Sequence, residues 1–189
     1  MRHVLGAVAL VLLVTPCLAA QYDIKRESDG PFQFKLYGVD INKGSTLQRE
    51  SVLFNDPTCP VQISRNSMTF DYSDRRLTIA ASTQIAIRQP VMAMEVRHIL
   101  FDVFGQHMRN LSNTEARDFS VGASALKATW NLYDENDASE HLTTVSYISR
   151  ARLVDGTQWI VNIDNLTAAL GSLHLERKIE DEIPPKTTP

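Results

Sequence analysis

The chain has 189 residues, of which 43% are hydrophobic and 22% are charged. This balance is typical of a globular protein and excludes a disordered chain, and the length suits one domain preceded by a leader. The formal net charge of −3 argues against nucleic acid as a partner, because phosphate binding requires a concentrated positive surface.

Residues 1–20 have the features of a secretory signal peptide. A basic start at Arg2 precedes an apolar run from Val4 to Val14, and Pro16 and small residues follow. The run is shorter than the about 20 apolar residues that span a bilayer. We therefore expect cleavage after Ala19 or Ala20, a mature protein that is periplasmic or secreted, and no stable membrane insertion after cleavage.

Cleavage of this leader would leave Cys59 as the single cysteine, so that no internal disulfide could form. In an oxidising compartment the thiol is then either buried and inert or paired with another molecule. Its position between Thr58 and Pro60 indicates a small buried hydrophobe at the start of a strand. Pairing between molecules stays open.

The segment after the leader predicts short strands separated by turns. Phe32–Ile41 alternates apolar and polar residues with the period of a half-buried strand. Leu47–Phe54 predicts a second strand, which ends at the turn cluster Asn55-Asp56-Pro57 because proline removes a ladder donor. Three more predicted strands follow at Val61–Ile63, Met68–Tyr72 and Leu77–Ile87.

Val91–Phe104 is the most apolar long segment, with apolar side chains on both faces of the predicted strand. Such a strand belongs in the interior of a sheet or between layers. His98 lies on one of these faces and is expected to be a packed histidine with a satisfied nitrogen. Gln106–Ser124 is polar and predicts an irregular segment, after which Leu126–Tyr133 resumes the strand alternation.

Thr143–Ile163 reads as two strands joined at Asp155-Gly156, because a type I′ turn needs positive φ angles that these residues tolerate. A two-residue loop at this position sets Arg152 opposite Trp159. Directly opposed residues share a face. We therefore expect the Arg152 guanidinium to lie over the Trp159 ring, with Arg150 nearby.

The last predicted element is a short helix at Leu166–Leu173, capped by Asp164. Its leucines would cover an apolar face formed by Ile148, Val161 and Ile163. Residues 172–179 are compatible with helix or strand. The predicted domain spans residues 21–183, and residues 184–189 form a disordered tail.

Strands that recur about every 8–15 residues, with turn signals and no interleaved helices, predict a mostly β fold, an antiparallel sandwich with a short C-terminal helix. The runs FNDPTCPV at Phe54–Val61 and VRHILFDVFG at Val96–Gly105 resemble uncharacterised exported bacterial immunoglobulin-like domains. That resemblance implies an immunoglobulin-like β-sandwich and an exported location. It supplies no active site, because a fold does not fix a function.

Signatures of catalysis and metal binding are absent from the sequence. It has no Gly-x-Ser-x-Gly, phosphate-loop or dinucleotide motif, and its five histidines show no pairing at i, i+4 and no cysteine partner. The acidic stretch Asp134–Glu140 contains calcium-type oxygen ligands without the spacing of an EF-hand. We therefore expect neither an enzyme nor a cofactor.

These observations predict a non-catalytic binding or assembly module that interacts with another envelope protein. Its expected working surfaces are an exposed sheet edge and the face with Arg150, Arg152 and Trp159, since Trp and Arg are favoured at interfaces. Alternatives are a small-molecule or calcium-binding periplasmic protein and a hydrolase with a dispersed site. The sequence predicts no oligomeric state.

Overall fold

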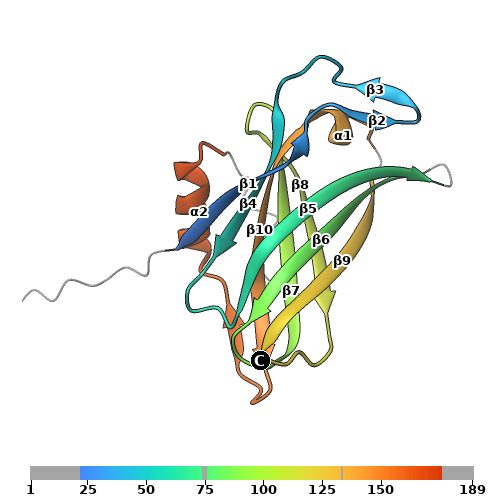
Figure 1. The fold of residues 1–189 in the computed structure, drawn as a ribbon. Coiled ribbons are helices and arrows are strands. Elements are labelled where there is room, and N and C mark those ends of the chain that lie inside the picture. Colours follow the sequence, from blue (N-terminus) through green and yellow to red (C-terminus); the bar gives the residue numbers. More distant parts are fainter. Residues whose placement is uncertain (1–21, 74–75, 133, 176–189) are drawn as a thin grey trace, which may run out of the picture.

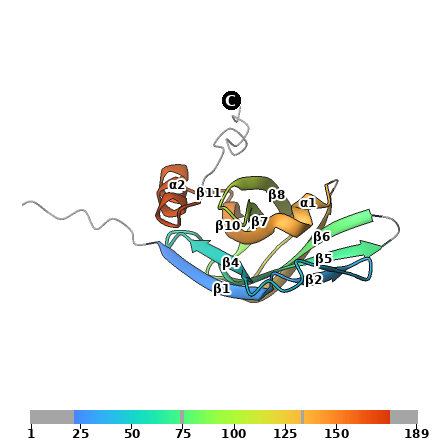
Figure 2. The same cartoon turned by 90° about the horizontal axis from the view of Figure 1, so that it is seen from above.

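The computed structural model describes residues 22–73, 76–132 and 134–175 (Figure 1). The predicted signal peptide and the predicted tail at 184–189 lie outside the described residues. Two β-sheets of unequal size face each other, and a helix packs on the far side of the larger one (Figures 1 and 2). No helix of the described ranges is both long enough and apolar enough to cross a membrane.

The larger sheet has six strands, in the order β1 (Asp23–Pro31), β4 (Gln48–Asn55), β10 (His141–Leu153), β7 (Val91–Asp102) and β8 (His107–Glu115), with β11 (Gln158–Ile160) also paired to β10. The smaller sheet consists of β5 (Val61–Ser73), β6 (Arg76–Ile87) and β9 (Gly122–Leu132). A separate hairpin contains β2 (Phe34–Leu36) and β3 (Val39–Ile41). The two helices of the described chain are α1 (Asn136–Glu140) and α2 (Ile163–Ser172).

The prediction of a mostly β chain with a short C-terminal helix is confirmed. One strand pair differs from the expected antiparallel arrangement: β4 and β10 run parallel, from Thr143 opposite Glu50 to Tyr147 opposite Phe54. The other described pairs are antiparallel. A parallel pair requires a long crossover, and here it is supplied by the strands between β4 and β10.

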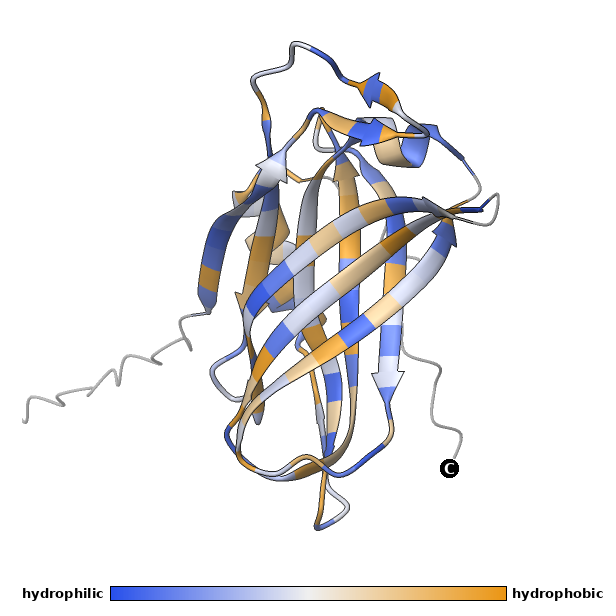
Figure 3. Cartoon of the chain, turned by 45° about the vertical axis from the view of Figure 1, so that its right-hand side comes forward, coloured by the Kyte–Doolittle hydropathy of each residue, from blue (hydrophilic) through white to orange (hydrophobic). Residues whose placement is uncertain are grey.

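The hydrophobic core lies on both faces of the larger sheet. Between the sheets, Val96 and Leu100 of β7 pack with residues of β5, β6 and β9. On the opposite face, which we call the outer face, Ile99 and Phe101 pack with Leu166 and other residues of α2. The prediction that β7 is an interior strand is thus confirmed. Bands of alternating hydropathy along the smaller sheet match its single buried face (Figure 3).

Helix α2 begins earlier than the sequence indicated. Asn162 is the N-cap, and its side-chain oxygen accepts a hydrogen bond from the Asn165 backbone N at 3.1 Å. Asp164 therefore lies in the first turn and is not the cap. Residues 172–179 were compatible with helix or strand, and of these only Ser172 is helical among the described residues. A turn follows, in which Leu175 N donates to Leu170 O at 3.1 Å. Residues 176–179 lie outside the described residues.

Several strand predictions are corrected by turns that the pattern did not reveal. Phe32–Ile41 is not one strand, because Tyr37 and Gly38 adopt φ angles of 55° and 78° and form the two-residue turn between β2 and β3. The two short strands expected between residues 61 and 72 are one strand, β5, with a register shift between Ile63 and Arg65.

Two strands were missed, and one predicted loop contains a helix. The polar segment expected to be irregular includes β8, in which Leu111 is the one buried hydrophobic residue. The charged segment at the start of the described chain forms β1 at the sheet edge. Both lack a clear apolar alternation because an edge strand faces solvent over much of its length. The acidic stretch contains α1.

Candidate functional site

The loop that joins β10 and β11 is one residue longer than the sequence predicted. Leu153 N donates to Thr157 O at 2.9 Å, and Gly156 N donates to Leu153 O at 3.0 Å, so the loop has three residues instead of two. Gly156 has a φ angle of 89°, as expected for the left-handed residue that ends such a loop. Arg152 consequently faces Gln158, and Trp159 faces Ala151.

This one-residue change places the predicted site residues on opposite sides of the hairpin, because successive side chains of a strand alternate between faces. Arg150 and Arg152 lie on the outer face together with Gln158. Trp159, opposite Ala151, points to the other side of the hairpin. Its half-buried ring packs against residues of both core clusters, and its Nε1 donates to Thr58 Oγ1 at 3.0 Å. The predicted stacking of Arg152 on Trp159 is therefore wrong.

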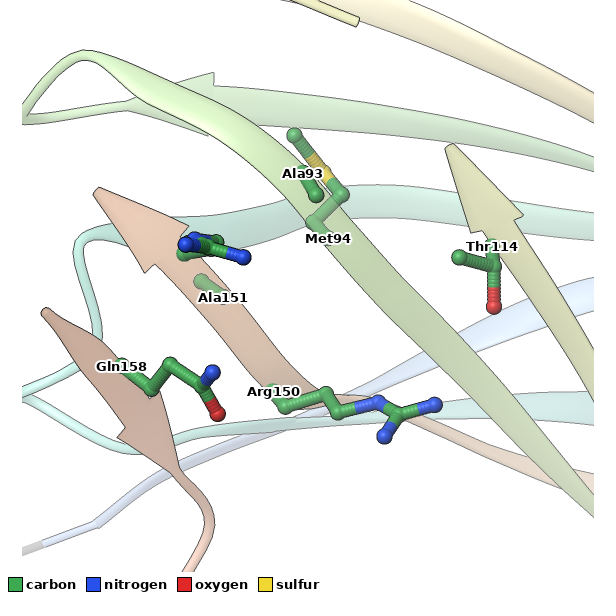
Figure 4. Close-up of a pocket in the computed structure, with 7 residues that line it drawn as sticks. Ala93, Met94, Thr114, Arg150, Ala151 and Gln158 are labelled. Atoms are coloured by element: carbon green, nitrogen blue, oxygen red, sulfur yellow. The ribbon is translucent and has the colours of Figure 1, made fainter. Parts of the chain in front are cut away.

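The two arginines border a groove on the outer face with a volume of about 180 Å³ (Figure 4). We call it the arginine groove; its lining residues are Ala93, Met94, Thr114, Arg150, Ala151, Arg152 and Gln158. Figure 4 shows Arg150 and Gln158 reaching in from β10 and β11, and Thr114 lying across β7 on β8. The short side chain of Ala93 leaves this part of the sheet open.

Arg150 is held in position by a buried carboxylate. Its Nε lies 2.8 Å from Glu95 Oε2, which also accepts a hydrogen bond from Ser149 Oγ at 2.8 Å. Arg97 approaches the other oxygen, Oε1, at 3.3 Å. The Glu95 side chain is 7% exposed, whereas that of Arg150 is 42% exposed. The guanidinium is thus anchored on its inner side and open to solvent on its outer side.

Arg152 is exposed and has no hydrogen-bond or ion-pair partner within residues 22–73, 76–132 and 134–175. Two guanidinium groups therefore face one groove. The Glu95 carboxylate pairs with Arg150 and Arg97, and it does not pair with Arg152. Guanidinium is a planar, permanently charged donor that matches the geometry of carboxylate and phosphate. The chemistry of the groove is that of anion recognition.

The histidines and the cysteine lie apart from this groove. His98 is buried and its Nδ1 lies 2.9 Å from Ser146 Oγ, which confirms the expectation of a packed histidine with a satisfied nitrogen. Burial lowers the pKa of His98 to about 4 and that of His141 to about 3. Cys59 is buried, as expected, and burial raises the pKa of its thiol to about 12. It lies in the turn before β5 and not in the strand itself.

The acidic stretch around α1 is tied to the sheet. The Asp137 carboxylate forms an ion pair with Arg109 of β8, and burial raises the pKa of Asp137. Across the part of the chain that the structure describes, no group of three or more His, Cys, Asp or Glu side chains is arranged to hold a metal ion.

Glu95, Ser149, Gln158 and Thr114 were not identified from the sequence. Glu95 offered a signal, because a single carboxylate in the apolar run of β7 needs a cationic partner if it is buried. The identity of that partner could not be read from the sequence, since it comes from β10. Gln158 was missed because the expected register set Trp159 in its place.

Comparison with known proteins identifies no family. No protein-family model matches the chain, and no curated protein is significantly similar to it. The X-ray structure of a hypothetical protein from Peptoclostridium difficile 630 is similar with a TM-score of 0.44 and 9% sequence identity, over 60% of this chain and 92% of that one. Similarity at this level carries no information about function.

Proposed function

We propose that the mature chain is a non-catalytic binding or assembly module of the periplasm or the extracellular space, which holds another envelope protein through the arginine groove. One observation carries this proposal: Arg150 is fixed by the buried Glu95, and Arg152 is unpaired beside it, at a part of the outer face beyond the cluster under α2. The two facing sheets are compatible with an immunoglobulin-like sandwich, which we retain as part of the proposal.

The size of the groove favours a side chain of a partner protein over a metabolite. Its volume of about 180 Å³ is below the roughly 300–1,000 Å³ that is typical of ligand pockets. Arginine is enriched at protein interfaces. Because Glu95 already restrains Arg150, little side-chain entropy remains to be lost when a partner binds.

The second candidate function is capture of a small anion. The groove has room for one carboxylate or phosphate group, and its two guanidiniums supply the charge. Thermal melts with succinate, phosphate and calcium distinguish these possibilities. A rise of several degrees with either anion would support this second function, and a rise with calcium alone would support the calcium-binding alternative at a site other than the groove.

The proposal is tested by crosslinking in the native host, followed by mass spectrometry of the captured proteins. The double variant Arg150→Glu/Arg152→Glu should lose the partner that the wild type captures. Arg152→Glu alone should weaken capture without loss of stability, because Arg152 has no partner in the described chain. This single variant is needed because Arg150→Glu sets a second carboxylate beside Glu95.

A matched control is Lys43→Glu/Arg76→Glu, which makes the same change of charge at two exposed positions outside the groove lining. This control should capture the partner as well as the wild type does. Undiminished capture by a folded Arg150→Glu/Arg152→Glu variant would contradict the assignment of the groove as the binding surface.

A further inference from the structure

We propose that the free edge of β9 is a second binding site, which takes up an extended segment of a partner protein as a fourth strand of the smaller sheet. This inference is independent of the arginine groove. It rests on the hydrogen-bond directions in the smaller sheet and on how the other sheet edges are protected.

The directions of the backbone groups follow from two side-chain bonds on β5. Met68 N donates to Asp29 Oδ2 at 2.7 Å, and Ile63 N donates to Asn55 Oδ1 at 2.8 Å, so both residues turn their N–H groups away from β6. Ala81, opposite Met68, must then turn its backbone groups toward Ala128 of β9.

Because these directions alternate along a strand, the even-numbered residues of β9 bond to β6 and the odd-numbered ones face outward. The outward residues are Ala123, Ala125, Lys127, Thr129 and Asn131, and all five are exposed. Within the described ranges their backbone groups make no hydrogen bond outside the sheet. The pairing of β9 with β6 continues without a register shift from Gly122 to Leu132. The edge is therefore a regular and unoccupied hydrogen-bonding surface.

The edge of β5 is protected by side chains. Asn55 occupies both backbone groups of Ile63, with its Nδ2 donating to Ile63 O at 2.9 Å, and Asp29 occupies the N–H of Met68. The register shift between Ile63 and Arg65 further interrupts this edge. Side-chain caps and bulges are devices that block strand addition.

The edges of the larger sheet at β1 and β8 are also interrupted, and its third edge strand, β11, is only three residues long. The outer strand β1 is charged and loses its register between Ser28 and Pro31. On β8 the carbonyl of Ser112 accepts the Trp130 indole N–H at 3.1 Å, and the pairing of β8 with β7 shifts register near Phe101. The edge of β9 differs from these edges: along its 11 residues it has neither a side-chain cap nor a bulge, and Lys127 is its one charged residue.

The sheet suggests the chemistry of the segment that would bind. An added strand would widen the three-stranded sheet, which faces the six-stranded sheet. Its inward side chains would cover the half-buried Trp130 and Met108. These inward positions should be apolar. On the solvent side an acidic residue opposite Lys127 would add a cross-strand ion pair. A second copy paired along the whole edge would instead set Lys127 against Lys127, so we assign the site to a different protein.

The test uses hydrogen exchange of the mature protein, measured by NMR, with a synthetic peptide as the probe. The peptide has the sequence Thr-Val-Thr-Val-Glu-Val-Thr-Val-Thr, which places valine toward the interior and glutamate opposite Lys127. In the free protein the five outward amides should exchange about 100-fold faster than the even-numbered amides of β9. The peptide should protect the five, and the same peptide N-methylated at alternate amides should not.

Ala125→Pro provides a variant that removes one outward N–H and leaves the bonds to β6 in place. Its Tm should stay within a few degrees of the wild type, and its affinity for the peptide should fall about tenfold. Ala128→Pro, which breaks a bond to β6, should instead lower the Tm strongly. Arg152→Glu should leave peptide binding unchanged, because the groove and the edge are separate sites.

Three outcomes would overturn the proposal. The first is failure of millimolar peptide to protect any outward amide, and the second is equal binding by Ala125→Pro. The third is protection of the outward amides in the free protein together with a dimer in sedimentation, which would assign the edge to a second copy of this chain.

Discussion

Glu95 is the residue on which the geometry of the arginine groove depends. A carboxylate on a central strand is stable when its oxygens are paired, and Ser149, Arg97 and Arg150 supply the partners. Because these partners come from two strands, the carboxylate also fixes the register between them at the position where β10 carries an extra residue. A buried charge thus sets the position of an exposed one.

Two further buried residues, His98 and His141, make stability depend on pH. Their folded pKa values of about 4 and about 3 lie below the ordinary value of 6.5 because burial disfavours the charged form. Above pH 6.5 both states are neutral and the contribution is complete. Below pH 6.5 the unfolded chain binds protons that the folded chain does not, so the free energy of unfolding falls. We expect a loss of about 2 kcal/mol for each histidine between pH 7 and pH 5 in urea unfolding.

The variant His98→Gln separates this effect from the titration of carboxylates. Glutamine keeps a polar group near Ser146 but does not titrate. Unfolding of the variant should therefore take up about one proton fewer near pH 5 than unfolding of the wild type, which lowers the slope of the unfolding free energy against pH. Equal slopes for the variant and the wild type would contradict the assignment of a neutral buried His98.

At the scale of the elements, the register of one hairpin decides which residues share a site. A two-residue loop between β10 and β11 would set Trp159 opposite Arg152, whereas the observed three-residue loop sets Gln158 there. The difference arises at Val154, which joins Asp155 and Gly156 in the loop. The half-buried Trp159 packs against the core and bonds to Thr58, and Arg152 remains unpaired in the groove.

The hairpin register predicts unequal effects of two substitutions. Trp159→Ala should lower the free energy of unfolding by about 2–4 kcal/mol, because a half-buried ring and its hydrogen bond are lost. Arg152→Ala should change it by less than about 0.5 kcal/mol, because the side chain is exposed and unpaired. Urea unfolding of both variants measures the difference, and a comparable loss for Arg152→Ala would contradict the register.

At the scale of the whole molecule, the larger sheet is covered on both faces. The smaller sheet buries one face, and α2 buries part of the other against Val145 and Tyr147. The predicted covering of Val161 by the leucines of the helix is confirmed. The prediction was wrong for the other two residues: Ile148 packs between the sheets, and Ile163 is the first residue of α2 itself, because β11 ends at Ile160. The apolar residues of β10 contribute to two cores because successive side chains alternate between faces, and the register shift between Ile148 and Arg150 turns Ala151 toward the core between the sheets as well.

The double-sided core predicts that α2 is part of the folding unit. Leu166→Ala and Leu170→Ala should each lower the free energy of unfolding by about 2–5 kcal/mol, because both leucines are buried. Ala168→Ser, at an exposed position of the same helix, should change it by less than about 0.5 kcal/mol. A helix that unfolded on its own at low urea, before the sheets, would contradict this prediction.

The sequence by itself determined the local features of this protein. Alternation over Leu77–Ile87 and Val91–Phe104 predicted strands, a leucine repeat predicted α2, and the two apolar faces of β7 predicted an interior position. These predictions succeeded because each depends on residues that are neighbours in the chain. The resemblance to exported immunoglobulin-like domains, the leader and the envelope partner stay predictions.

Only the tertiary structure decided which distant residues meet. The ion pair of Glu95 with Arg150, the parallel pairing of β4 with β10, the edge positions of β1 and β8 and the open edge of β9 all depend on strand order and register. Strand order and register cannot be read from a local sequence pattern. A shift of one residue in a loop changes few local contacts, and yet it reverses the face of every side chain in the strand that follows.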